Sequence, residues 1–238
     1  MMLALAVALG IALGPVEAYN QGNRLYAAKD FPGAVLAYQE ALKAGHDARV
    51  HYNLGNALFR TGKIGEAIAN YRRAYYLAPR DRDTQTNLAF ARAYRVDKLP
   101  QSQGPIGRAA QRALRCLSRR EAALLAAAMF SLAGLMLSVW IVWRRAAPGV
   151  LAVLLGIAAL YGFVAQQLWA GEVAGRPAVV IEPEVNALSG PGEEFKQVML
   201  LHDGTEVGIR ETRGEYDLVQ LPGGNGGWLK ASALMRVY

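Results

Sequence analysis

The sequence has one cysteine, Cys116, and three histidines in 238 residues. A single thiol excludes an intramolecular disulfide and a cysteine-based metal cluster. The histidines, His46, His51 and His202, follow no metal-ligand spacing, and the sequence has no glycine-rich phosphate loop and no nucleophile elbow. We therefore expect no catalytic residues, no metal and no cofactor, and we predict that the protein is not an enzyme.

Acidic residues are also scarce, with 19 Asp and Glu against 26 Lys and Arg and a net charge of +7. The basic residues are dispersed, and many stand beside apolar segments, so we expect no nucleic-acid partner. Apolar residues make up 53% of the chain and are concentrated in residues 1–16, 122–143 and 149–169. The remaining sequence suffices only for small soluble modules.

The first segment predicts a secretory signal peptide. Residues 1–15 are uncharged, apolar and too few to span a bilayer, and small residues at Val16 and Ala18 end the run as at a cleavage site. We predict that residues 1–18 are the signal peptide. The basic residues that usually open such a peptide are missing, and an uncleaved anchor or a buried first helix is the alternative.

The next segment contains an internal repeat with a spacing of 33 residues. The first copy is Gly22-Asn23, Ala34, Tyr38 and Ala41-Leu42, and the second is Gly55-Asn56, Ala67, Tyr71 and Ala74-Tyr75. Small residues at Gly22, Ala34, Gly55 and Ala67 predict two helical hairpins whose helices cross closely at these positions. Turns are expected at Lys29-Asp30 and Gly62-Lys63, and Pro79 ends the second hairpin.

Residues 52–79 closely resemble the tetratricopeptide repeat (TPR) family, and residues 18–44 resemble it less closely. A third helix around Asn87, Leu88 and Ala91 is placed like the start of another repeat, and we expect it to cap the stack in a TPR domain of residues 19–96. In this family the first helices line a groove that binds a partner peptide or helix. The resemblance places the following residues in that groove: Tyr19, Asn23, Tyr26, Arg49, Tyr52, Asn56, Phe59, Arg60, Phe90 and Tyr94. The alternative is that two repeats form only a shallow groove in which these aromatic residues pack against one another.

Residues 122–143 and 149–169 predict a membrane hairpin. Each run is uncharged and long enough to cross the hydrocarbon core, and residues 144–148 join them. Residues 97–121 form a basic linker, which we expect to lie along the bilayer as an amphipathic helix. Its arginines alone would place the termini in the cytoplasm, whereas the signal peptide would place both soluble modules in the periplasm. We predict the periplasmic orientation in a bacterial inner membrane.

Residues 177–238 change to short β-prone runs separated by turns. Ser189-Gly190-Pro191, residues 202–205, residues 215–219 and residues 226–229 resemble the bacterial SH3-like (SH3b) family, although that family often has a tryptophan where Tyr216 stands. This resemblance implies an all-β SH3-like barrel that binds cell-wall peptides or proteins.

The order of these modules, with residues 201–207 and 87–100, resembles the BatE group of the Bat aerotolerance family over nearly the whole chain. The resemblance implies a multidomain scaffold made of all-α TPR hairpins, two transmembrane helices and an SH3-like barrel. It also implies partners among von Willebrand A domain membrane proteins and a MoxR-type ATPase. A peptidoglycan-binding envelope protein, anchored through its SH3b domain, is the alternative.

Overall fold

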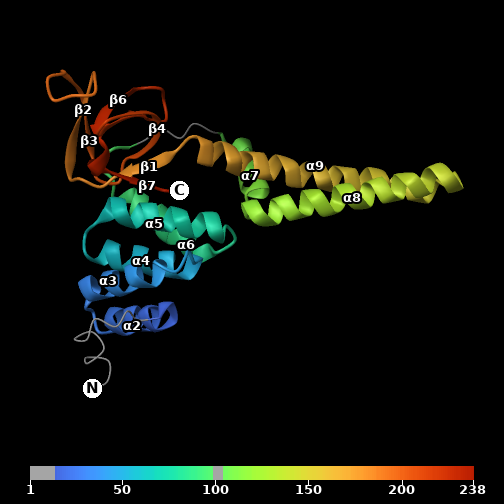
Figure 1. Cartoon of the computed structure of the whole chain (residues 1–238), viewed down its shortest axis with the longest axis horizontal. Helices are drawn as coiled ribbons and strands as arrows, with labels where there is room; N and C mark the ends of the chain where they lie inside the picture. Colours follow the sequence, from blue (N-terminus) through green and yellow to red (C-terminus); the bar gives the residue numbers. More distant parts are fainter. Residues whose placement is uncertain (1–13, 99–103) are drawn as a thin grey trace. The chain divides into compact units, whose positions relative to one another are not determined.

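The computed structural model describes residues 14–98 and 104–238 (Figure 1). Most of the predicted signal peptide and part of the predicted basic linker lie outside the described residues. The chain divides into two compact units, one of residues Met1–Pro100 with Arg176–Tyr238 and the other of Gln101–Gly175. The repeats and the C-terminal strands therefore belong to the same unit.

A stack of antiparallel helices forms the first part of this unit. The helices are α2 (Pro15–Ala27), α3 (Phe31–Leu42), α4 (Ala48–Arg60), α5 (Ile64–Leu77) and α6 (Arg82–Ala93). The side chains of Asp30, Asp47 and Asp81 accept backbone N–H groups at the starts of α3, α4 and α6, where the first turn of a helix leaves donors unpaired. The turn residues Lys29 (φ 63°) and Gly62 (φ 82°) adopt left-handed backbone conformations, as expected where one helix reverses into the next.

The predicted crossings of the hairpins are confirmed. A Cβ atom on Gly22 would lie 2.5 Å from the ring of Tyr38, and one on Gly55 would lie 2.7 Å from the ring of Tyr71. Such distances are too short for a real contact, so only glycine permits each tyrosine ring to lie across the neighbouring helix. Ala34 and Ala67 are fully buried, as a close crossing requires.

The C-terminal part of the first unit is an antiparallel sheet. Its strands are β1 (Pro177–Val180), β2 (Glu184–Leu188), β3 (Gln197–His202), β4 (Glu206–Arg213), β5 (Tyr216–Gln220), β6 (Gly226–Lys230) and β7 (Leu234–Arg236), with the 3₁₀ turn η1 (Ala231–Ala233) before β7. The seven strands are ordered β3-β2-β6-β5-β4-β1-β7. The described ladders leave β3 and β7 at the edges, so the sheet is open and the closed barrel expected from the sequence is not confirmed.

Val219 and Trp228 lie in two of the segments that carry the SH3b resemblance, and both belong to the interior of the sheet. Val219 is fully buried and Trp228 is 7% exposed. Gly204 has a φ of 86°, and a Cβ atom on Gly227 would lie 3.0 Å from the carbonyl oxygen of Leu188. A turn and a close backbone approach therefore account for the two glycines.

The second unit contains α7 (Pro105–Leu114), α8 (Arg119–Trp143) and α9 (Ala146–Ala174). Ser118 and Glu121 form a capping box that starts α8. The two long helices meet closely at Gly162, where a Cβ atom would lie 2.8 Å from the carbonyl oxygen of Ala122. Helices α8 and α9 are each long and apolar enough to cross a membrane, by length and composition.

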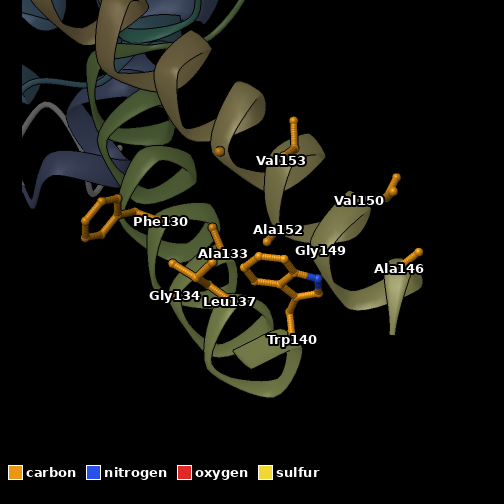
Figure 2. Close-up of a pocket in the computed structure, with 11 residues that line it drawn as sticks. Phe130, Ala133, Gly134, Leu137, Trp140, Ala146, Gly149, Val150, Ala152 and Val153 are labelled. Atoms are coloured by element: carbon orange, nitrogen blue, oxygen red, sulfur yellow. The ribbon is translucent and has the colours of Figure 1, made fainter. Parts of the chain in front are cut away.

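Near the turn between α8 and α9, a groove of about 730 Å³ lies between the helices. Figure 2 shows that Trp140 extends from α8 toward Gly149 of α9, and a Cβ atom on that glycine would lie 2.9 Å from the indole ring. The groove is lined entirely by apolar residues such as Phe130, Leu137 and Val153.

Candidate interaction surfaces

The residues predicted for the groove lie on the first helices of the hairpins, α2 and α4, and on α6 or directly after it. The structure brings members of this set together with Tyr38, Asn53, Tyr71 and Asn87, which were not predicted, in two polar networks, and it also forms a group of aromatic rings. The two networks are built from the same residue types, one repeat apart.

The first network joins α2, α3 and α4. The hydroxyl of Tyr38 donates to Oδ1 of Asn23 at 2.8 Å, and Nδ2 of Asn53 donates to the same oxygen at 3.1 Å. Nδ2 of Asn53 also lies 3.2 Å from the hydroxyl of Tyr19. Burial raises the pKa of Tyr38 to about 12, so the hydroxyl keeps its proton and acts as a donor.

The second network repeats this arrangement on α4, α5 and α6. The hydroxyl of Tyr71 donates to Oδ1 of Asn56 at 2.7 Å, while Nδ2 of Asn87 donates to that oxygen at 2.9 Å and to the hydroxyl of Tyr52 at 3.1 Å. Burial raises the pKa of Tyr71 above its ordinary value. The side-chain oxygen of Asn56 therefore accepts a hydrogen bond from a buried tyrosine of the same domain.

Each network leaves amide groups available. Within the described parts of the chain, Nδ2 of Asn23 and Nδ2 of Asn56 have no hydrogen-bond partner. Asn23, Asn53 and Asn56 line one hollow of about 210 Å³ with Tyr26 and Tyr38. Because an amide N–H can donate to a backbone carbonyl, these positions suit contact with an extended chain.

The aromatic rings gather at one end of the first helices. Phe59 lies 5.5 Å from Phe90 and 5.2 Å from Tyr94, measured between ring centroids. Phe90 and Tyr94 are 53% and 58% exposed. The guanidinium of Arg60 lies 4.8 Å above the ring of Phe31, and Phe31 also contacts Tyr26. Exposed aromatic rings beside an arginine are typical of protein-binding surfaces.

Arg49 stands apart from this aromatic group. It lies near the start of α4, where its guanidinium contacts Asp47 at 3.2 Å. Together with Tyr19 it lines a hollow of about 430 Å³. The predicted groove residues therefore form a polar group in the middle of the groove and an aromatic group at one end. Arg49 lies apart from both groups, in the hollow that it shares with Tyr19.

The structure also shows an interface that the sequence reading did not predict, because the sheet packs against α5 and α6. The carboxylate of Glu206 on β4 receives Nε and Nη2 of Arg92 at 2.7 and 2.8 Å, Nη1 of Arg95 at 3.1 Å and Nη1 of Arg72 at 3.4 Å. Burial alone would raise the pKa of Glu206, but the three arginines outweigh it and lower the pKa to about 2. We call these four residues the arginine–glutamate cluster.

The turn before Glu206 contacts the segment after α6. Asp97 accepts the backbone N–H of His202 at 2.9 Å and the hydroxyl of Thr205 at 2.5 Å, and it contacts Nδ1 of His202 at 3.0 Å. Although burial raises the pKa of Asp97, the hydrogen bonds from Thr205 and His202 bring it below its ordinary value. His202 is thus part of the interface, as are Glu206 and Asp97.

The start of α5 meets the same turn. Oδ1 of Asp203 accepts the backbone N–H of Gly65 at 2.9 Å. A Cβ atom on Gly65 would lie 2.1 Å from the carbonyl oxygen of Val180, so the sheet approaches the helix backbone directly. Val179 and Val237 complete the contact, because they lie in the same buried core as the helical repeats.

The remaining histidines, His46 and His51, line a hollow together with Arg73 and Val237. Nε2 of His51 lies 2.8 Å from Nδ1 of His46, and Nδ1 of His51 lies 3.0 Å from Oδ1 of Asn70. Burial lowers the pKa of His51 to about 4. Nearby, Nε of Arg73 donates to the carbonyl oxygen of Val237 at 3.0 Å. In the described residues no group of three or more His, Cys, Asp and Glu side chains is placed to hold a metal ion.

Comparison with known families identifies the helical stack. Residues 19–82 match the tetratricopeptide repeat family model. The match begins within α2 at Tyr19, covers α3 to α5 and ends at the first residue of α6, so it stops before the sheet and the two long helices. A comparison with curated proteins finds no match to the chain. Tetratricopeptide repeats generally mediate protein–protein interactions, which agrees with the exposed aromatic end of the first helices.

Proposed function

We propose that this chain is a non-enzymatic, membrane-anchored scaffold that binds partner proteins through the first helices of its TPR domain. The observation that supports this function best is the position of the sheet. It packs on α5 and the end of α6, while Phe90, Tyr94 and Arg60 on the other side stay exposed. The aromatic end of the groove is therefore free for a partner.

The groove suits a partner segment with an apolar anchor and an extended backbone. The rings of Phe59, Phe90 and Tyr94 offer apolar contact, and the free amide donors of Asn23 and Asn56 offer hydrogen bonds to backbone carbonyls. The same residues were expected in the groove from the resemblance to the TPR family.

We extend the proposal to a BatE-like protein with an SH3-like sheet in the bacterial inner membrane, with both soluble modules in the periplasm. The apolar helices α8 and α9 would form the anchor. The partners in this proposal are von Willebrand A domain membrane proteins and a MoxR-type ATPase system. The support is the sequence resemblance, and the two segments that carry it, residues 87–100 and 201–207, include the contacting residues Arg92, Asp97 and Glu206.

A binding site for peptidoglycan on the sheet is the competing function, and it is favoured less. The turn of residues 202–205 contributes to the resemblance with the SH3b family. His202 and Asp203 in this turn, and Glu206 directly after it, contact the helical stack. These side chains are thus engaged within the chain.

Site-specific photocrosslinking in intact cells tests the scaffold function. A photoreactive phenylalanine at position 90 or 94 should give crosslinks to defined partner proteins. Leu36 on α3 is the matched control, because it is apolar and 69% exposed but lies on a second helix. Equal crosslinking from position 36, or none from 90 and 94, would rule out the groove. Co-sedimentation of the full chain in detergent with purified cell wall would instead favour the peptidoglycan-binding function.

A further inference from the structure

The charges of the second unit are nearly all of one sign. Residues 104–175 contain seven arginines, no lysine and only two acids, Glu121 and Glu172. Both acids are engaged inside the unit: Glu121 accepts the backbone N–H of Ser118 at 2.9 Å, and Glu172 contacts Arg115 at 2.6 Å. Residues 104–175 therefore contain more arginines than these two acids can neutralise.

Three of these arginines are exposed, and we call them the basic collar: Arg112 on α7 and Arg119 and Arg120 at the start of α8. None of the three makes an ion pair with any residue in the described ranges. The first turn of a helix carries the positive end of the helix dipole and disfavours cations. Helix stability therefore does not explain why Arg119 and Arg120 stand there.

Contacts with α9 fix the position of the collar within this unit. The hydroxyl of Tyr161 donates to the carbonyl oxygen of Ala113 at 2.7 Å, and Nε1 of Trp169 donates to that of Leu117 at 2.8 Å. The guanidinium of Arg115 lies 5.1 Å above the ring of Trp169. The segment between α7 and α8 is therefore held against α9 near Trp169.

Exposed apolar residues lie on both helices that carry the collar. Leu124 on α8 is 61% exposed, and Ile106 on α7 is 86% exposed. An exposed cationic group that borders an exposed apolar helix surface matches a molecule with an anionic head and an apolar tail.

We infer that the basic collar binds the phosphate headgroups of anionic phospholipids, with their acyl chains against the apolar surface that begins at Leu124. This inference rests on the membrane anchor of the proposed function. It adds a preference for lipid charge at one end of the hairpin. Arginine suits this role because its guanidinium forms paired hydrogen bonds to phosphate oxygens.

Quenching of Trp169 by brominated lipids in vesicles tests the inference. The full chain would carry Trp140→Phe, Trp143→Phe and Trp228→Phe, so that Trp169, which lies beside the collar, is the only reporter. We expect brominated phosphatidylglycerol to be enriched about fivefold over brominated phosphatidylcholine near Trp169, which corresponds to the attraction of a single arginine near a membrane surface. Arg119→Gln with Arg120→Gln should remove most of this preference.

The matched control is Arg144→Gln with Arg145→Gln, which removes the same charge between α8 and α9 and should leave the preference at Trp169 intact. Equal quenching by the two lipids overturns the inference but leaves the membrane anchor standing. Absence of quenching by either lipid overturns the anchor and the inference together. Loss of the preference in excess inorganic phosphate would assign the collar to free phosphate and would also overturn the lipid assignment.

Discussion

The two tetratricopeptide repeats share one internal network but differ on the outer side of their second helices. Tyr38 bonds to Asn23 in the first repeat as Tyr71 bonds to Asn56 in the second. Pairs of residues 33 positions apart that differ include Pro32 and Gly65, Leu36 and Ala69, and Glu40 and Arg73. Leu36 is 69% exposed, whereas Ala69 is fully buried.

This difference explains why the sheet packs on the second repeat. Gly65 lets the carbonyl of Val180 approach the helix, and Arg73 donates to backbone carbonyls near the end of the sheet. The first repeat has a proline and an acid at the corresponding positions, and no contact of that kind is made there by the described residues. The residues that are the same in both repeats thus form the hairpins. The residues that differ determine whether the sheet packs on the outer surface of a repeat.

The largest expected effect is the removal of Glu206. Glu206→Ala leaves three arginines close together without their carboxylate, and loss of one partner of a buried ion pair costs about 3 to 5 kcal/mol. Chemical denaturation of the full chain in detergent measures this loss of unfolding free energy. Glu193→Ala is the control, because Glu193 pairs with Lys230 in the open, and its removal should change stability little. Equal effects would contradict the role of the arginine–glutamate cluster.

The next effect is the pH dependence contributed by His51, a residue of the second repeat whose counterpart in the first repeat is Ala18. Burial lowers the pKa of His51 to about 4, below its ordinary value of 6.5. The folded state therefore binds fewer protons, so the stabilisation is complete above pH 6.5 and is lost as the pH falls to 4. The loss should reach at most about 3 kcal/mol. Denaturation at a series of pH values should show this slope, and His51→Gln should remove it.

A smaller effect is expected from Gly65→Ala. Its Cβ atom would collide with the carbonyl oxygen of Val180, and overpacking of this kind costs about 1 to 3 kcal/mol. Proteolysis should then cut the sheet faster while the hairpins stay resistant. Pro32→Ala changes the corresponding position of the first repeat and should leave the sheet as resistant as in the natural sequence. Slower or unchanged cleavage in Gly65→Ala would show that the sheet does not press on this helix.

An effect no larger than that of Gly65→Ala separates the two roles of Asn56. Asn56→Ala removes the acceptor of the buried Tyr71 hydroxyl and should cost about 1 to 3 kcal/mol. Tyr71→Phe removes the orphaned donor, so adding it should recover part of the loss. Asn56→Ala should also reduce partner crosslinking at position 90. If crosslinking is still reduced when Tyr71→Phe is added, the free Nδ2 of Asn56 contacts the partner. Recovery of crosslinking together with stability would instead make Asn56 purely structural.

The local elements were predictable because their signals are local. The spacing of 33 residues, the glycine–tyrosine pairs and the turn at Gly62 identify the hairpins. The strands β2 and β7 have weak sequence signals, since Glu184, Asn186 and Ala187 have low strand propensity and β7 is only three residues long. Pairing with neighbouring strands compensates for that low propensity.

The interface between the repeats and the sheet could not be predicted, because its partners lie far apart in the sequence. Glu206 follows Arg92 by 114 residues, and Asp203 follows Gly65 by 138. In the sequence the arginines belong to a dispersed basic set, and residues 202–205 carry a resemblance to the SH3b family that does not indicate a contact with the repeats. Only the folded chain shows that these charges meet.

Hydrogen–deuterium exchange of the full chain tests most directly whether the repeats and the sheet are docked as one unit. The N–H of Gly65 lies in the first turn of α5, where amides lack a partner within the helix, and here it donates to Asp203. Slow exchange at Gly65 therefore reports the docked sheet. We expect slow exchange at Gly65 and at His202 in the natural sequence, and faster exchange at both sites in Glu206→Ala, with α2 and α3 unchanged. Rapid exchange at Gly65 in the natural sequence would contradict it.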